Sequence, residues 1–208
     1  MMNNICKKWL GYVGVMLFTI HCSLFTVSCS EDESATEEYP NWQARNDATT
    51  EQWAANSSYR KIRTYTQDDT ATGSSADYIY VEVLETGSGT VSPFATDTVR
   101  VSYRGRLIPS TTYTDGYVFD QTYLGDFSWQ TAGVASNTTA GGFMQGFSTA
   151  VMNMHIGDRW RVHIPYQLMY YASSSNAYPA YSNMTFDIAL VDFWHPGERR
   201  PDFRARLR

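Results

Sequence analysis

The chain has little cysteine, and all three residues lie near its N-terminus: Cys6, Cys22 and Cys29. If the first 28 residues are a cleaved leader, as argued below, Cys29 alone remains. An intramolecular disulfide and a thiolate metal site are then both excluded. The histidines show no spacing typical of metal ligands: His21, His155, His163 and His195. We therefore expect no metal and no other cofactor.

Other signatures are also missing. The sequence contains no glycine-rich phosphate loop and no G-x-S-x-G nucleophile elbow. Only 18% of the residues are charged, and the net charge of -5 argues against nucleic acid as a partner. Aromatic residues are abundant instead, with 15 Tyr, 10 Phe and 6 Trp. Tyrosine at this density favours strands and amphipathic contact surfaces over a helical bundle.

The first 28 residues are typical of a secretion signal. Lys7 and Lys8 precede an apolar stretch, Trp9 to Ile20, that is too short for a membrane-spanning helix. Residues 24–29 read Leu-Phe-Thr-Val-Ser-Cys, which resembles a bacterial lipobox with Cys29 as the lipidated residue. The alternative is an ordinary cleaved signal followed by an unrelated cysteine.

An acidic run, Ser30-Glu31-Asp32-Glu33, follows Cys29 directly. It resembles the surface-export signal of Bacteroidetes lipoproteins, although a solvated acidic tether would have the same composition. Together the leader and Cys29 predict a bacterial cell-envelope protein that is lipid-anchored to the outer membrane, on its periplasmic or outer face.

Four segments follow from these patterns: a leader (1–28), a tether and helical arm (29–77), a main domain (78–194) and a basic tail (195–208). In the arm, residues 40–56 are predicted to be a helix with Trp42 and Trp53 on nearly one face. This helix would pack on the main domain or pair with a second copy in a homodimer. The tail arginines would contact lipid phosphates or remain solvated.

The main domain alternates apolar and polar residues in several stretches, which predicts strands. These stretches are 78–85, 98–107, 117–120, 159–165 and 184–193. Between them, Phe147, Val151 and Met154 share one face of a short helix that Gly157 ends. We expect an α+β domain, in which a twisted antiparallel sheet of five to six strands wraps around one short helix.

The order of several short motifs resembles the FKBP family of peptidyl-prolyl isomerases, from about Tyr78 to Phe193. In chain order the motifs are Val101-Ser-Tyr103-Arg-Gly105, Tyr117-Val-Phe119-Asp120, Phe127-Ser-Trp129, Phe143-Met-Gln-Gly146-Phe147, Met154-His-Ile-Gly157-Asp158, Ile164-Pro165 with Tyr170, and Thr185-Phe186-Asp187-Ile188. No single motif is specific, but seven in the right order are. The family's fold, a curled sheet over one helix, agrees with the strand pattern.

The resemblance implies a site between sheet and helix that binds proline-containing polypeptides. Its apolar parts would be the walls Tyr103, Phe119 and Phe186, the floor Phe147, the rim residues Phe143 and Met144, and the outer wall Phe127. Its polar parts would be the Asp120 carboxylate, the Tyr170 hydroxyl and the Met144 backbone N–H, and Tyr178 would cap it. Judged singly, each aromatic residue is equally consistent with a core position, and Asp120 with a turn.

The chain departs from the family pattern at several places. Gln145 stands where arginine is common, and Tyr171 stands where glycine is usual. Residues 130–142 form a longer stretch, and Ala180 and Tyr181 replace a proline-rich tip. The resemblance predicts a prolyl isomerase that assists folding, and the departures keep open a non-catalytic binding module or a holdase chaperone.

Overall fold

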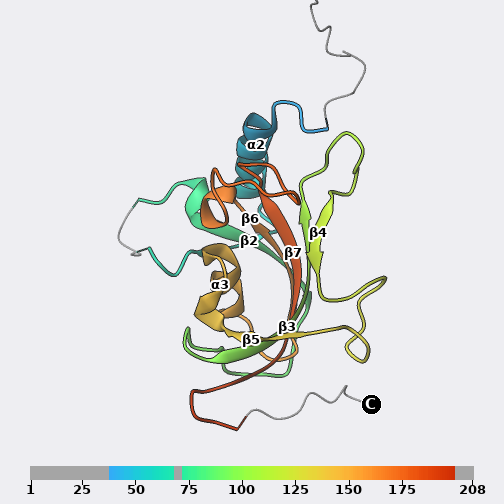
Figure 1. The fold of residues 1–208 in the computed structure, drawn as a ribbon. Coiled ribbons are helices and arrows are strands. Elements are labelled where there is room, and N and C mark those ends of the chain that lie inside the picture. Colours follow the sequence, from blue (N-terminus) through green and yellow to red (C-terminus); the bar gives the residue numbers. More distant parts are fainter. Residues whose placement is uncertain (1–37, 68–71, 200–208) are drawn as a thin grey trace, which may run out of the picture. The chain divides into compact units, whose positions relative to one another are not determined.

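The computed structural model describes residues 38–67 and 72–199, so the predicted leader, Cys29 and most of the basic tail lie outside it. Within the described residues, two α-helices and seven strands are arranged as shown in Figure 1. In chain order they are α2 (Trp42–Ala55), β1 (Arg60–Arg63), β2 (Tyr78–Glu85), β3 (Thr98–Leu107), β4 (Val118–Gln121), β5 (Ala135–Thr139), α3 (Gln145–Val151), β6 (Arg159–Ile164) and β7 (Met184–Trp194).

One antiparallel sheet holds all seven strands, in the order β1-β2-β6-β7-β3-β4, with β5 pairing to β3. The longest pairing runs from Thr98 opposite Trp194 to Leu107 opposite Met184. The sheet curls around α3 (Figure 1). The predicted α+β fold is confirmed. The sheet has more strands than the five or six predicted, because β1 pairs with β2 at the edge of the sheet and β5 forms within residues 130–142.

The apolar face of the sheet packs on α3 and forms the core. Ile79, Val101, Ile188 and Leu190 are completely buried there, as the strand alternation predicts. Tyr80 points to the opposite face and is also completely buried, with its ring 6.3 Å from that of Trp53. The helix α2 therefore covers part of the outer face of the sheet.

The helix α3 begins earlier and ends earlier than predicted. It stops at Val151, and turns carry Met154 into the core as a completely buried side chain. Gly157 adopts a left-handed φ of 92° after these turns, and its backbone packs against Gly87. Its role is thus to close the turn before β6, not to end the helix. At the other end, a Cβ on Gly146 would lie 2.2 Å from Ile164, so glycine there lets α3 start against β6.

The helix α2 lies within the predicted residues 40–56 and packs on its own domain. Its buried positions are Trp42, Asn46, Thr50 and Trp53, spaced at helical intervals. The two tryptophans agree with the predicted face. The buried amide of Asn46 between them was not foreseen, because a polar side chain normally indicates the solvent face.

Candidate functional site

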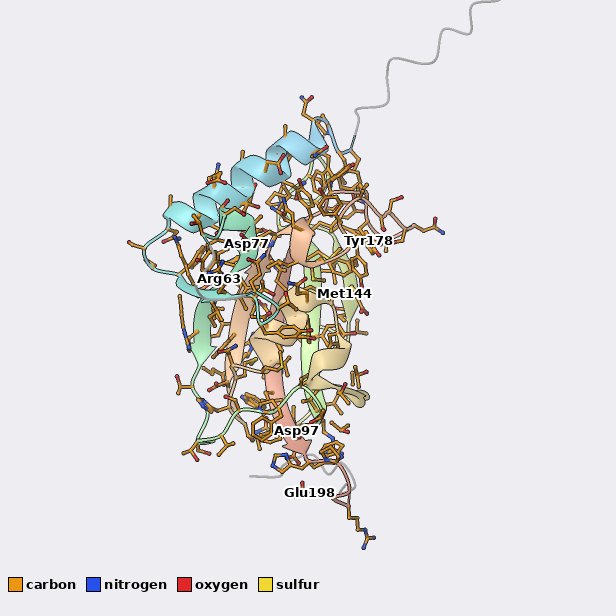
Figure 2. All side chains as sticks on the ribbon, turned by 90° about the vertical axis from the view of Figure 1, so that its left-hand side faces the viewer. Arg63, Asp77, Asp97, Met144, Tyr178 and Glu198 are labelled. Atoms are coloured by element: carbon orange, nitrogen blue, oxygen red, sulfur yellow. The ribbon has the colours of Figure 1, made fainter. Side chains whose placement is uncertain are left out.

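Aromatic side chains from several elements meet beside α3. We call this group the aromatic cluster. Its members are Tyr103 on β3, Phe119 on β4, Phe143 just before α3, Phe147 on α3, Tyr170 and Tyr178 on the loop between β6 and β7, and Phe186 on β7. Met144 is the N-cap residue just before α3, and Figure 2 shows Tyr178 above it in that view.

Phe186 lies at the centre of the cluster. Its ring centroid is 5.1 Å from Phe147, 5.5 Å from Phe119 and 6.1 Å from Tyr103, in edge-to-face arrangements. Edge-to-face contacts are the geometry that aromatic pairs prefer. Phe147 and Phe186 are buried, whereas Tyr103, Phe119 and Phe143 are half-buried. The cluster thus has a buried floor and walls whose edges reach the surface.

Gly105 makes the close approach of two walls feasible. A Cβ at this position on β3 would lie 2.5 Å from a Phe186 ring carbon and 2.8 Å from a Phe119 ring carbon. Any larger residue would therefore push the rings apart. The sequence motif contained this glycine, but only the structure shows what it does.

The polar groups lie at the edge of the cluster. The Tyr103 hydroxyl donates a hydrogen bond of 2.8 Å to the carboxylate of the exposed Asp120. Burial, followed by this hydrogen bond, raises the pKa of Tyr103 well above its usual value. Burial also raises the pKa of Tyr170. Both phenols therefore stay protonated at neutral pH and are able to donate hydrogen bonds.

Residues 89–191, which contain the whole aromatic cluster, match the sequence model of the FKBP-type peptidyl-prolyl cis-trans isomerases. The domain belongs to the FKBP family. The Macrophage infectivity potentiator of Trypanosoma cruzi is 33% identical over 115 residues, covering 55% of this chain and 52% of the relative. The FKBP-type 22 kDa peptidyl-prolyl cis-trans isomerase of Escherichia coli K12 is 31% identical over 111 residues, which cover 53% of this chain and 47% of the relative.

Solved structures agree on the FKBP fold. The crystal structure of FkpA from Escherichia coli superposes with a TM-score of 0.55 at 19% identity, over 93% of this chain and 73% of that one. A peptidyl-prolyl cis-trans isomerase from Pseudomonas syringae pv. tomato gives a TM-score of 0.53 at 22% identity, over 73% of this chain and 92% of that one. The chain spans about half the length of the first two curated relatives, and 38% of FkpA.

The loop between β6 and β7 of this FKBP domain holds two stacked tyrosines. The rings of Tyr170 and Tyr178 lie 4.8 Å apart at 21°, and Tyr178 meets Phe119 at 5.9 Å. Tyr171, where the family usually has glycine, has a left-handed φ of 50°. The chain therefore keeps the backbone that glycine adopts easily, and the Tyr171 ring packs against Tyr166 at 5.7 Å.

Phe127 is a predicted site residue that the structure places elsewhere. Its ring lies 5.4 Å from Tyr123 and 5.1 Å from Trp129, and the Arg159 guanidinium stacks over it at 4.6 Å. The Trp129 indole N–H donates to Glu85 at 2.8 Å, which fixes this group against the ends of β2 and β6. Phe127 thus belongs to a second aromatic group. The sequence could not show this, because Phe127 lies in the irregular segment between β4 and β5.

Gln145, the second departure from the FKBP pattern, connects α3 to the arm. Its amide N–H donates to the Thr64 hydroxyl at 2.7 Å and also to that of Thr66. Thr149, one turn later, accepts from the Tyr65 backbone N–H at 3.4 Å. The segment after β1 is therefore bonded directly to the helix that carries Phe147.

Proposed function

We propose that this protein is a peptidyl-prolyl cis-trans isomerase that assists protein folding in the bacterial cell envelope. The supporting observation is the aromatic cluster, in which rings from several elements surround Phe186 and the hydrogen-bonded pair Tyr103–Asp120 lies at its edge. Family membership supports the reaction type.

The chemistry requires a shaped apolar site more than a reactive group. Resonance keeps a prolyl amide planar, with a rotation barrier of about 18–20 kcal/mol, and unaided isomerisation takes tens to hundreds of seconds. The twisted amide has lost this resonance and is less polar than the planar form. A water-poor aromatic surface therefore tolerates the twisted form better than water does, and each ~1.4 kcal/mol of preference accelerates rotation about tenfold.

The residues present suit the required tasks. Phe119, Phe147 and Phe186 would hold the pyrrolidine ring of the proline. The Met144 backbone N–H and the Tyr170 hydroxyl would bind the flanking carbonyls, with Phe143 at the rim and Tyr178 as the cap. Asp120, held by Tyr103 at 2.8 Å, would lie beside the twisting bond. No bond breaks, so this proposal needs no nucleophile.

An isomerisation assay tests the proposal. The chain from Ser30 onward contains every described residue and should accelerate a proline-peptide substrate. A double variant, Phe119→Ala with Asp120→Ala, should lose at least about 100-fold in kcat/KM if the wall and the carboxylate act on the transition state. Leu124→Ala removes a side chain that is 84% exposed and lies outside the cluster, so it serves as the control.

Measurements of peptide binding and of client aggregation, made beside this assay, separate the two alternative functions. Tight binding of a proline peptide with no acceleration by the wild type would identify a non-catalytic binding module. Suppression of client aggregation that survives the double variant would identify a holdase. Equal rates for the wild type and the double variant would disprove the enzymatic proposal.

Lipid anchoring through Cys29 is part of this proposal and is supported by residues 24–33 alone. Among the residues that the structure describes, no helix is long and apolar enough to cross a membrane. Labelled palmitate should be incorporated into the full chain and not into a Cys29→Ala variant. Equal labelling of both would refute the anchor.

A homodimer through the arm is a further part of the proposal. The buried face of α2 is occupied by its own domain, so a dimer would use the outward face, where Ala44, Ala48 and Gln52 are exposed. Analytical ultracentrifugation of the chain from Ser30 onward should show a dimer, and the Ala48→Arg variant should be a monomer. A monomer at all concentrations would exclude it.

A further inference from the structure

A cavity outside the aromatic cluster is lined in part by Tyr178. We call it the side groove: a cavity of about 490 Å³ lined by Glu38, Tyr39, Thr112, Tyr113, Tyr117 and residues 175–179. Its walls come from the arm, from the turn between β3 and β4, and from the loop between β6 and β7. Its volume lies within the range of about 300–1,000 Å³ that is typical of ligand sites.

The side groove and the aromatic cluster share the Tyr178 side chain. Tyr178 stacks on Tyr170 and meets Phe119, and it also lines the groove. A client polypeptide continues on both sides of the proline that the cluster would hold. One flank of an extended client that is bound at the cluster would therefore pass Tyr178 and reach the groove.

The lining of the groove has a defined chemistry. Tyrosine supplies four of its side chains, and Tyr113 and Tyr117 form an edge-to-face pair at 4.9 Å. Among the described lining residues, Glu38 alone carries a charge. Hydrogen bonds from Ser110 and Thr112 hold its carboxylate and lower its pKa, so it is ionised at neutral pH.

A carboxylate among tyrosine rings attracts a cationic side chain in two ways. The charge pairs with lysine or arginine, and the ring faces add a cation–π contribution. The nearby Arg45 does not supply this cation, because its guanidinium donates to the Pro109 carbonyl and stacks over Trp42.

We propose that the side groove is a second binding site, which receives a lysine or arginine of the client polypeptide a few residues away from the proline. The proposal rests on the proposed function, because the cluster defines where the client starts. It adds a sequence preference that the aromatic cluster alone would not have.

Fluorescence anisotropy with labelled peptides tests this preference. A Leu-Pro core peptide would be extended by Lys-Ala-Lys, Ser-Ala-Ser or Glu-Ala-Glu, first on its N-terminal and then on its C-terminal side. On one of the two sides, the lysine extension should lower the Kd about fivefold relative to the serine extension. The glutamate extension should raise it, and about 0.5 M salt should remove most of the difference.

Two variants locate the preference. Glu38→Gln removes the charge, and Tyr113→Ala removes a ring that is 43% exposed, so either should reduce the lysine advantage to less than about twofold. Asp126→Asn removes the same charge from an exposed position outside the groove and should keep the advantage. Equal Kd values for the unextended core in all variants would show that the aromatic cluster is intact.

The outcomes separate this proposal from the proposed function. Equal affinity for all three extensions on both sides, or a lysine advantage that survives both variants, would overturn the second site. If the core itself does not bind, the proposed function fails. The groove is then still tested by the lysine peptide with alanine in place of proline, which should bind the wild type more tightly than Glu38→Gln.

Discussion

His163 is a single residue whose surroundings fix its protonation state. It lies on β6 at the outer face of the sheet, with its ring 5.0 Å from Trp53 and 4.9 Å from Tyr59. Its Nδ1 lies 2.9 Å from the Thr185 hydroxyl. Burial, with a further contribution from Arg161, lowers the pKa of His163 to about 4. The folded protein therefore holds this imidazole neutral.

This burial predicts a loss of stability in acid. In the unfolded chain the pKa of His163 is near 6.5, so between about pH 6.5 and 4 the unfolded state binds the proton and the folded state does not. The free energy of unfolding therefore does not depend on His163 above about pH 6.5. As the pH drops to 4, it falls by up to about 3 kcal/mol because of this residue. Urea unfolding at several pH values should show this slope.

A His163→Gln variant provides the control for the carboxylates that titrate in the same range. Its stability should fall less between pH 6.5 and 4 than that of the wild type. The same slope in both proteins would show that His163 does not carry the effect.

Residues differ in how far the sequence could place them. The resemblance to the FKBP family implied that Tyr103, Phe119, Phe147 and Phe186 lie around one site, and their rings do meet around Phe186. Phe127 was predicted as an outer wall and packs with Tyr123 and Trp129 instead, because the side chains of an irregular loop have no periodicity that fixes their direction. Asn46 was missed for a different reason, since its burial depends on a partner, Asn183, that is distant in the sequence.

At the scale of elements, α2 holds the loop that carries Tyr170 and Tyr178. The Asn183 backbone N–H donates to Asn46 at 2.8 Å, and its side chain donates to the Asn46 carbonyl at 2.7 Å. The Tyr166 N–H donates to the Asn183 side chain at 2.9 Å, so both ends of the loop share one residue. Trp42 adds a hydrogen bond of 2.8 Å to Ser182.

An Asn46→Ala variant should loosen this loop. The buried Asn183 N–H would lose its acceptor, which costs about 1–3 kcal/mol of unfolding free energy. Hydrogen exchange should become faster at residues 166–183, and a proline peptide should bind more weakly. Gln52→Ala, on the exposed face of the same helix, should change neither. Unchanged exchange in Asn46→Ala would show that α2 does not order the loop.

Strands were easier to predict than the other elements. The bounds predicted for β2 and β3 agree with the structure, because alternation extends over eight to ten residues there. The helix α3 has only seven residues, so the apolar positions 147, 151 and 154 could not show that Met154 lies beyond its end. The strand β5 lacks large apolar residues, and it forms because β3 offers a free edge.

At the scale of the whole molecule, the described arm and the FKBP domain form one structure. The match to the family begins at residue 89, yet three parts that precede it are built into the fold. Trp42 and Trp53 of α2 are buried, β1 pairs with β2, and Thr64 accepts a hydrogen bond from Gln145 on α3. The sequence alone did not decide whether the helix of the arm packs on its own domain or pairs with a second copy in a homodimer.

A chain that starts at Ser74 should therefore be much less stable than the chain from Ser30. Deletion of α2 and β1 uncovers Tyr80 and His163 and leaves β2 as an unpaired edge strand. A start at Ser74 keeps the capping box between Ser74 and Asp77. Loss of two buried tryptophans costs at least about 3–5 kcal/mol. Calorimetry should show a Tm at least about 10 °C lower, and light scattering should show aggregation.

Two further chains would show which part of the arm is responsible. Trp53→Ala in the otherwise intact chain should reproduce part of the fall in Tm, because it opens the outer face over Tyr80 and leaves β1 in place. A chain that starts at Glu38 keeps every described residue of the arm and should melt like the parent. If the chain from Ser74 instead kept the parent Tm and its affinity for a proline peptide, the arm would be an appendage. The bonds from Asn46 and Gln145 would then have no energetic consequence for the site.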